Sequence, residues 1–273
     1  MSGYIELKIE VADSHRKEML IAQLSAAGAN GFEEEKSLLK AFISNEDYNE
    51  SESREIIEKN GLKYSVSVIE EINWNAEWEA NFKPVQVGNF CTVRAAFHEA
   101  NSSVKHDIII TPKMSFGTGH HATTHMMLQA MEGLDFNNKA VFDFGTGTGI
   151  LSILAEKSGA RHITAIDNDE WSITNAIENF NSNRCHKILL SNNKEMTENE
   201  LFDIILANIN RNIILQNLQS IKQHLALNGV VLLSGLLTGD EALVIEECKK
   251  HGLALKQRTE MSGWICLLMV SGQ

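Results

Sequence analysis

The segment AVFDFGTGTGILSILAEKSGARHITAIDND, residues 140–169, constrains the fold more than any other stretch of this chain. An apolar run leads into a glycine-rich turn, a helical pattern follows, and a second apolar run ends at Asp167. That order predicts a strand, a tight turn, a helix and a parallel strand, the unit from which doubly wound α/β sheets are built. The turn and Asp167 then meet at the carboxyl edge of the sheet, where such sheets bind ligands.

The spacing of the glycines separates two classes of ligand. Gly145, Gly147 and Gly149 alternate with single residues, whereas the dinucleotide fingerprint has two residues before its third glycine. Asp167 lies 22 residues after Gly145, where a carboxylate can accept both hydroxyls of a ribose. Asp143 precedes the turn, and an acid there repels a pyrophosphate but suits an ammonium and a sulfonium. The pattern favours S-adenosylmethionine, and the two carboxylates disfavour a tight turn without any ligand.

A second strand end adds a polar side chain to the same edge. The run FDIILANIN predicts a buried strand that finishes in Asn208-Ile209-Asn210. The amide of Asn208 can present a carbonyl oxygen and N–H donors to a substrate or cofactor. Its alternative role is a helix cap, because a helical pattern begins directly after this segment. Asn210 fits the cap position better, which leaves Asn208 for the site.

A third element lies upstream, in TPKMSFGTGHHATTHMM. Residues 116–119 predict a mobile loop, and Thr123 and Thr124 open the helix that follows it. His121 and His125 are four residues apart, which raises a zinc site as an alternative. The glutamate of the H-E-x-x-H motif is absent and the sequence offers no third ligand. We therefore predict no metal.

The chain divides into two unequal parts. Residues 1–72 predict the order β-α-β-β-α-β, a small ferredoxin-like α+β domain. A connector helix is predicted over 73–84, with Trp74, Trp78 and Phe82 on one face. The glycine-rich domain then occupies 85–273 and begins with strands at about 85–97 and 106–111.

The glycine-rich domain alternates strands and helices, which predicts a parallel sheet covered on both faces. The last two strands are separated only by a turn at Ser262-Gly263, so they form an antiparallel hairpin. The predicted strands are 140–144, 162–166, 187–190, 203–207, 230–234, 253–259 and 263–270.

Net charge, cysteine spacing and the absence of long apolar runs indicate what kind of partner the protein binds and in which cellular compartment it works. The 36 acidic residues exceed the 24 basic ones, giving a net charge of −12 that repels a nucleic-acid backbone and attracts a basic partner. The four cysteines are scattered without a C-x-x-C pair, which favours reduced thiols. The sequence has neither a membrane-length apolar run nor the pattern of a signal peptide at its start. We expect a cytoplasmic protein with no direct nucleic-acid readout and no membrane partner.

Taken together, these stretches resemble the ribosomal protein L11 methyltransferases, the PrmA family. The resemblance runs along most of the chain through WNAEWEANFKP, FGTGHHATT, DFGTGTGIL, AIDND and LANI. It implies a class I methyltransferase domain with S-adenosylmethionine contacts at Thr124, Gly145, Asp167 and Asn208, and a front domain that selects the substrate. Two positions depart from the family, which usually has proline at Ala122 and Cys-Gly-Ser at residues 146–148.

The resemblance implies transfer of a methyl group to amines of basic ribosomal protein L11, at lysine side chains and with the N-terminal amine as a further candidate. Asn208 is expected to orient the amine, and no residue is required as a base, although His120, His121 and Asp143 are candidates. The alternatives are a small-molecule methyltransferase and a non-catalytic assembly module that binds S-adenosylmethionine. The candidate cofactor-binding residues are Thr124, Gly145, Asp167, Asn208, Asp143, Gly147 and Phe116.

Overall fold

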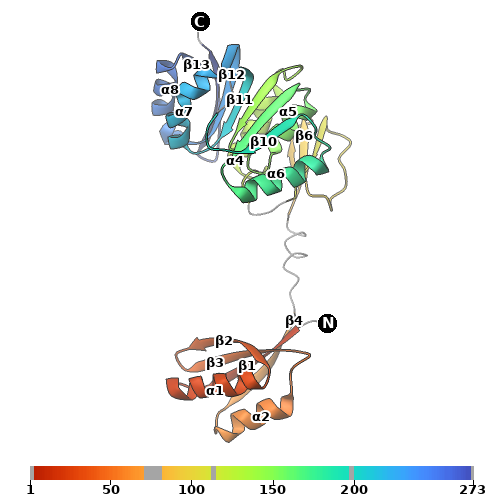
Figure 1. The fold of residues 1–273 in the computed structure, drawn as a ribbon, viewed down its shortest axis with the longest axis vertical. Coiled ribbons are helices and arrows are strands. Elements are labelled where there is room, and N and C mark those ends of the chain that lie inside the picture. Colours follow the sequence, from red (N-terminus) through yellow and green to blue (C-terminus); the bar gives the residue numbers. More distant parts are fainter. Residues whose placement is uncertain (1–2, 71–81, 112–114, 197–199, 272–273) are drawn as a thin grey trace. The chain divides into compact units, whose positions relative to one another are not determined.

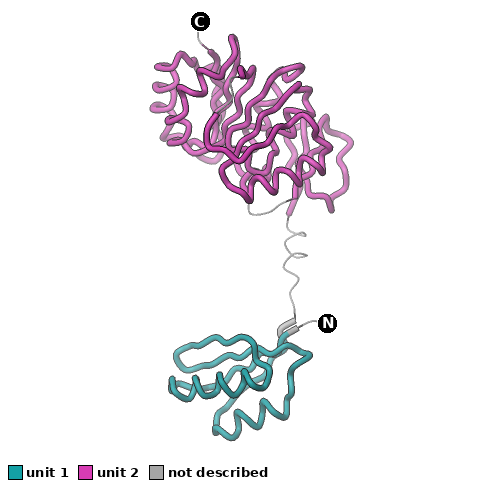
Figure 2. The backbone as a smooth tube through the Cα atoms, viewed as in Figure 1, with its two compact units in different colours: residues 1–81 teal, residues 82–273 magenta. Residues whose placement is uncertain are grey.

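The computed structural model describes residues 3–70, 82–111, 115–196 and 200–271. The chain forms two compact units, residues 1–81 and 82–273 (Figure 2). Of the connector helix predicted over 73–84, only residues 82–84 lie within the described part, and they are not helical. Trp74 and Trp78 lie outside the described residues. No helix in the described segments is long and apolar enough to cross a bilayer.

The first unit has the predicted element order, with its strands in one antiparallel sheet of order β2-β3-β1-β4. Alternate residues of β1, namely Ile5, Leu7 and Ile9, are buried on one face, as the period of the sequence requires. The side chain of Asp13 accepts a hydrogen bond from the Arg16 N–H at 2.8 Å and caps α1. The elements are β1 (Gly3–Glu10), α1 (Ser14–Ala26), β2 (Ala29–Glu35), β3 (Leu38–Ser44), α2 (Glu50–Lys59) and β4 (Tyr64–Glu70).

The second unit begins with a small sheet that corrects one prediction. The single strand predicted over 85–97 is wrong, because the chain turns at residues 88–90 and forms a hairpin. Gly88 has a φ of 51°, which permits that turn. The hairpin strands are β5 (Val85–Val87) and β6 (Cys91–Arg94), and β7 (His106–Ile109) pairs parallel to β6.

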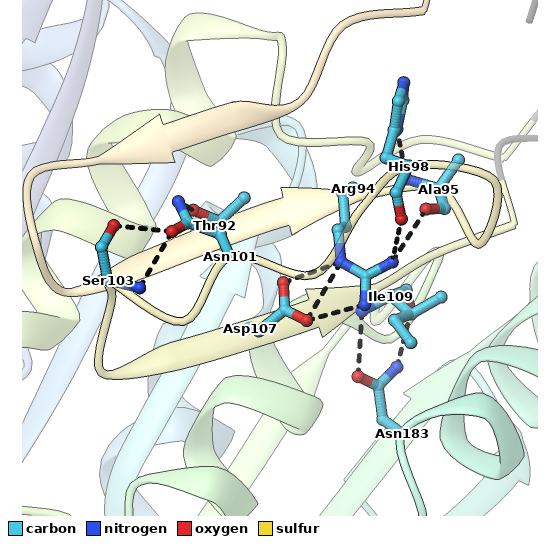
Figure 3. A network of polar contacts seen from close by, with 9 residues as sticks. All are labelled: Thr92, Arg94, Ala95, His98, Asn101, Ser103, Asp107, Ile109 and Asn183. Carbon is cyan, nitrogen blue, oxygen red and sulfur yellow. Dashed lines mark hydrogen bonds and ion pairs between the residues drawn. The ribbon is translucent and has the colours of Figure 1, made fainter.

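A partly buried ion pair joins β6 to β7 within this small sheet, and Asn183 joins the sheet to the rest of the unit (Figure 3). The Arg94 guanidinium donates two parallel hydrogen bonds to the Asp107 carboxylate, and its other nitrogen donates to the carbonyls of Ala95 and His98. Asn183 pairs with both backbone groups of Ile109, accepting from its N–H at 3.0 Å and donating to its carbonyl at 2.6 Å. The end of β7 is thereby fixed to Asn183, the C-cap residue of α6 (Glu170–Ser182).

The central sheet of the second unit confirms the predicted architecture. Its order is β10-β9-β8-β11-β12-β14-β13, with parallel neighbours from β10 to β12. The last two strands form the predicted antiparallel hairpin, and β14 lies between β12 and β13. The strands are β8 (Ala140–Phe144), β9 (His162–Asp167), β10 (Ile188–Asn192), β11 (Phe202–Asn208), β12 (Leu225–Leu237), β13 (Leu253–Met261) and β14 (Trp264–Ser271).

Helices cover both faces of this sheet, as Figure 1 shows. Successive residues of β8 belong to different cores, since Val141 packs with α4, α5 and α6 whereas Phe142 packs with α7 and α8. Burial on both faces explains why the central strands β8 and β11 are almost wholly apolar. The helices are α4 (Ala122–Glu132), α5 (Ile150–Lys157), α6 (Glu170–Ser182), α7 (Arg211–Gln223) and α8 (Glu241–Lys250).

Candidate active site

A cavity of about 410 Å³ opens at the carboxyl edge of the central sheet, at the ends of β8, β9 and β11. Six of the seven cofactor residues predicted from the sequence line it, and Asp143 does not. The six are Phe116, Thr124, Gly145, Gly147, Asp167 and Asn208.

The glycine-rich turn and Asp167 form one wall of the cavity. Gly147 donates its N–H to Asp167 Oδ2 at 2.8 Å, and Asp169 donates its N–H to Asp167 Oδ1 at 3.0 Å. Gly149 is the N-cap of α5, with a left-handed φ of 79°, so the chain turns directly from β8 into the helix. Each Asp167 oxygen retains acceptor capacity beside these bonds, because a carboxylate offers about four lone-pair sites.

Asp143 lies behind the turn and is completely buried. Its Oδ2 accepts hydrogen bonds from the hydroxyls of Thr146 and Ser152, both at 2.6 Å. Within the described part of the chain, its Oδ1 has no hydrogen-bond partner. Burial raises the pKa of Asp143 to about 6, the two hydroxyls oppose that rise, and the charge of Asp167 adds to it.

The raised pKa predicts a pH dependence of stability. The folded protein keeps the Asp143 proton to a higher pH than the unfolded chain does, so the stability from this group is present below about pH 4 and is lost as the pH rises through about 6. We expect wild type to lose about 2–3 kcal/mol relative to Asp143→Asn across that window. Urea unfolding of both proteins between pH 4 and 7 measures the difference, and parallel pH profiles would contradict it.

Asn208 lines the cavity, and only one end of its side-chain amide is hydrogen-bonded within the described residues. Its Nδ2 donates to Thr124 Oγ1 at 3.3 Å, whereas its buried Oδ1 has no partner among the described residues. Asn210 occupies the predicted N-cap position of α7, but its side chain makes no capping hydrogen bond. The prediction of the cap was therefore right in position and wrong in its hydrogen bond.

The cavity lining includes three aromatic side chains, those of Phe116, His121 and Trp264. The ring of His121 lies 5.2 Å from that of Phe116 and 4.9 Å from that of Trp264, centroid to centroid. His121 is also the N-cap of α4, and its Nδ1 lies 2.8 Å from Thr123 Oγ1. Phe116 belongs to residues 115–119, here called the Phe116 loop, and the residue is 52% exposed.

Sequence reasoning missed Trp264 and Gly235, which both line the cavity. A signal for Trp264 was present, because it follows the predicted turn at Ser262-Gly263. Because β14 pairs antiparallel with β12, it begins where β12 ends, and Trp264 pairs with Leu237 at that edge. Nothing local in the sequence marks Gly235, whose role depends on the backbone of another strand end.

His120 lies in a different environment from His121. Its Nε2 is 2.9 Å from the Lys83 carbonyl, its Nδ1 is 3.2 Å from Thr118 Oγ1, and its ring packs edge-on against Phe82. Both ring nitrogens are thus engaged by the protein. Among the described residues, no group of three or more His, Cys, Asp or Glu side chains is arranged to hold a metal ion.

Comparison with known proteins gives a consistent result. The family model for ribosomal protein L11 methyltransferase (PrmA) matches residues 4–271. The protein named ribosomal protein L11 methyltransferase from Porphyromonas gingivalis is 36% identical over 270 residues, covering 96% of this chain and 92% of its own length. Its namesake from Chlorobaculum parvum is 43% identical over 256 residues, covering 88% of this chain and 86% of its own.

A solved structure shows the same fold. The ribosomal protein L11 methylase of Lactobacillus delbrueckii subsp. bulgaricus has a TM-score of 0.66 and 24% identity, over 70% of this chain and 100% of that one. A methyltransferase from Pyrococcus furiosus has a TM-score of 0.52 and 18% identity, over 61% of this chain and 90% of that one. These structural neighbours confirm the predicted class I methyltransferase fold.

Proposed function

Because this chain belongs to the ribosomal protein L11 methyltransferase (PrmA) family, we propose that it methylates amine nitrogens of ribosomal protein L11, on lysine side chains and at the N-terminal amine. S-adenosylmethionine is the methyl donor of the family. One observation carries the amine assignment: Asn208 lines the cavity and its buried Oδ1 has no hydrogen-bond partner in the described part of the chain. A carbonyl oxygen placed in this way is ready to accept an N–H of an incoming amine.

The donor site fits S-adenosylmethionine in shape and in charge. The backbone of the glycine-rich turn is bare along the cavity, and Asp167 offers acceptor positions for the ribose hydroxyls. The carboxylates of Asp143 and Asp167 favour a cationic ligand over an anionic one. A second cavity of about 390 Å³ shares Gly145 and Asp167 with the first. It gives room for the adenine base of the donor. When bound, the donor supplies a methyl group activated by a sulfonium centre.

The acceptor must reach the cavity as a neutral amine. A lysine with a pKa near 10.4 is protonated at pH 7, and removing that proton costs about 4.6 kcal/mol. Apolar side chains reduce this cost because they destabilise the ammonium form. The cavity has such an apolar surface, which is formed by Leu151, Ile209, Ile213 and Trp264.

Asn208 then orients the amine by accepting one of its N–H groups, which directs the nitrogen lone pair toward the donor side of the cavity. Thr124 Oγ1 accepts from the Nδ2 end of this amide, and the Oδ1 end has no hydrogen-bond partner among the described residues. The His120 ring nitrogens are engaged and Asp143 is buried behind the turn, so neither is placed to take the proton. In our proposal the proton leaves to water, and most of the catalysis comes from positioning.

Two measurements test this function in sequence. Calorimetry with S-adenosylmethionine, and with NAD as the control ligand, is expected to show binding of the first only. Labelled methyl transfer to purified ribosomal protein L11, followed by peptide mass spectrometry, is expected to place methyl groups on lysine nitrogens and on the N-terminal amine. Donor binding without transfer to L11 would contradict the substrate assignment, and label confined to other atoms would contradict the amine assignment.

A further inference from the structure

Thr148 stands within the glycine-rich turn but is not part of the cavity wall. It is completely buried, and the cavity lining on either side of it comes from other residues. Its N–H donates to the Phe116 carbonyl at 3.0 Å, and its hydroxyl donates to the Gly117 carbonyl at 2.7 Å. Phe116 and Gly117 both line the cavity. Thr148, which does not line the cavity, therefore hydrogen-bonds to two consecutive residues that do, Phe116 and Gly117.

The contact between the turn and the Phe116 loop is close on both sides of Thr148. A Cβ atom on Gly147 would lie 2.4 Å from the Phe116 carbonyl oxygen. A Cβ atom on Gly117 would lie 2.8 Å from Thr148 Oγ1. Only glycine leaves space for this approach, so the two segments can pack together as the structure has them. We call this arrangement, with the Phe116 loop packed against the glycine-rich turn, the docked state.

The segments before and after the Phe116 loop are held by other residues. Asn179 accepts a hydrogen bond from the Thr111 N–H at 2.7 Å before the loop, and His121 caps α4 after it. The Nδ2 of Asn179 also donates to the Thr148 carbonyl at 2.8 Å. One asparagine of α6 thus fixes both Thr148 and the chain that leads toward the loop, while Thr148 holds the middle of the loop.

We infer that Thr148 is a positioning residue for methyl transfer: its hydroxyl fastens the Phe116 loop to the donor-binding turn, so that both walls of the cavity are assembled together. This inference rests on the proposed function only for its link to the donor. When the hydroxyl is lost, a smaller fraction of the protein has the loop docked. Donor affinity then falls in proportion to that fraction, because Phe116 and Gly117 line the cavity only in the docked state.

The test compares Thr148→Val, which keeps the shape and removes the hydroxyl, with Thr148→Ser, which keeps the hydroxyl. We expect Thr148→Val to weaken S-adenosylmethionine binding in calorimetry by up to about five- to tenfold, because the loss of one hydrogen bond can lower the docked fraction by no more than that factor. Thr148→Ser is expected to stay within about twofold of wild type. In steady-state assays the loss is expected in the KM for the donor more than in kcat at saturating donor.

Amide hydrogen exchange tests the loop without donor or acceptor. The Thr148 N–H is hydrogen-bonded to the Phe116 carbonyl, so its protection reports docking of the loop directly. We expect protection at residue 148 to fall about five- to tenfold in Thr148→Val and to be restored in Thr148→Ser. If the valine variant did not fold, Thr148→Ala would take its place with the same expected loss.

The outcomes separate this inference from the proposed function. Wild-type donor affinity together with wild-type protection in Thr148→Val would overturn the role of Thr148. A loss in the serine variant equal to that in the valine variant would also overturn it, since the hydroxyl would not be the cause. A wild-type protein that neither binds the donor nor methylates L11 would overturn the proposed function, while the exchange experiment would still decide the role of Thr148.

Discussion

Replacement of Asn208 by alanine is expected to lower kcat for methyl transfer to ribosomal protein L11 by about 100-fold or more. The change removes the buried Oδ1 that has no partner among the described residues, together with the hydrogen bond to Thr124. If Asn208 orients the amine, its loss leaves the acceptor in the cavity without a fixed direction for its lone pair. Donor affinity, measured by calorimetry, is expected to change by less than about tenfold.

Asn212→Ala provides the matched control for this prediction. Asn212 is exposed on the first turn of α7, and its Oδ1 accepts hydrogen bonds from the Arg211 side chain. It belongs to neither of the two adjoining cavities. We expect its kcat to stay within about twofold of wild type. Unchanged kcat in Asn208→Ala, or equal losses in the two variants, would remove Asn208 from the mechanism.

Gly235→Ala is expected to have the largest effect on stability. Gly235 has a φ of 80°, and an added Cβ would lie 2.3 Å from the carbonyl oxygen of Ile209 and 2.9 Å from its carbonyl carbon. These obstacles are backbone atoms, so no change of side-chain rotamer relieves the overlap. Overpacking together with the left-handed φ costs about 2–5 kcal/mol. Thermal unfolding is expected to shift downward by about 5–15 °C.

The same substitution is expected to reduce activity in the protein that remains folded. Ile209 follows Asn208 directly, so a displaced Ile209 backbone moves the amide that we propose orients the acceptor. We expect kcat to fall by about tenfold or more at a temperature where the variant is folded. Circular dichroism at the assay temperature verifies the folded fraction.

Gly239→Ala is the control for Gly235→Ala. It lies in the segment after β12, and a Cβ at Gly239 would meet no atom within 4 Å. Its stability is expected to remain within about 0.5 kcal/mol of wild type. A melting temperature for Gly235→Ala as high as that of the control would show that the strand ends of β11 and β12 can separate without cost.

Several features of the fold could be predicted because they are encoded by neighbouring residues. Apolar runs followed by helical patterns predicted the parallel strands from 140 onward, and the structure has them within a few residues, although β12 is longer than predicted. The short turn at Ser262-Gly263 predicted an antiparallel hairpin, which is present. Carboxyl ends of parallel strands share one edge of the sheet, so the sequence predicted that Asp167 and Asn208 lie close together. Both residues line the same cavity in the structure.

Other features depend on contacts that no local pattern records. The apolar character of 85–97 suggested one strand, but Gly88 turns the chain and β6 pairs with β7 instead of extending β5. Asp143 stands beside the glycine turn in sequence, yet the hydroxyls of Thr146 and Ser152 hold it behind the cavity wall. In both cases tertiary packing selected among conformations that the sequence pattern allowed.

The sequence by itself determined the class of sheet, the edge at which the cavity opens and six of the residues that line it, because strand direction and turn spacing are local properties. Only the tertiary structure decided which groups touch across that cavity. The Asn208–Thr124 pair joins residues 84 positions apart, and the Thr148–Gly117 pair joins residues 31 apart. Such contacts follow from how whole helices and strands pack, and a periodicity of two or about four residues carries no information at those separations.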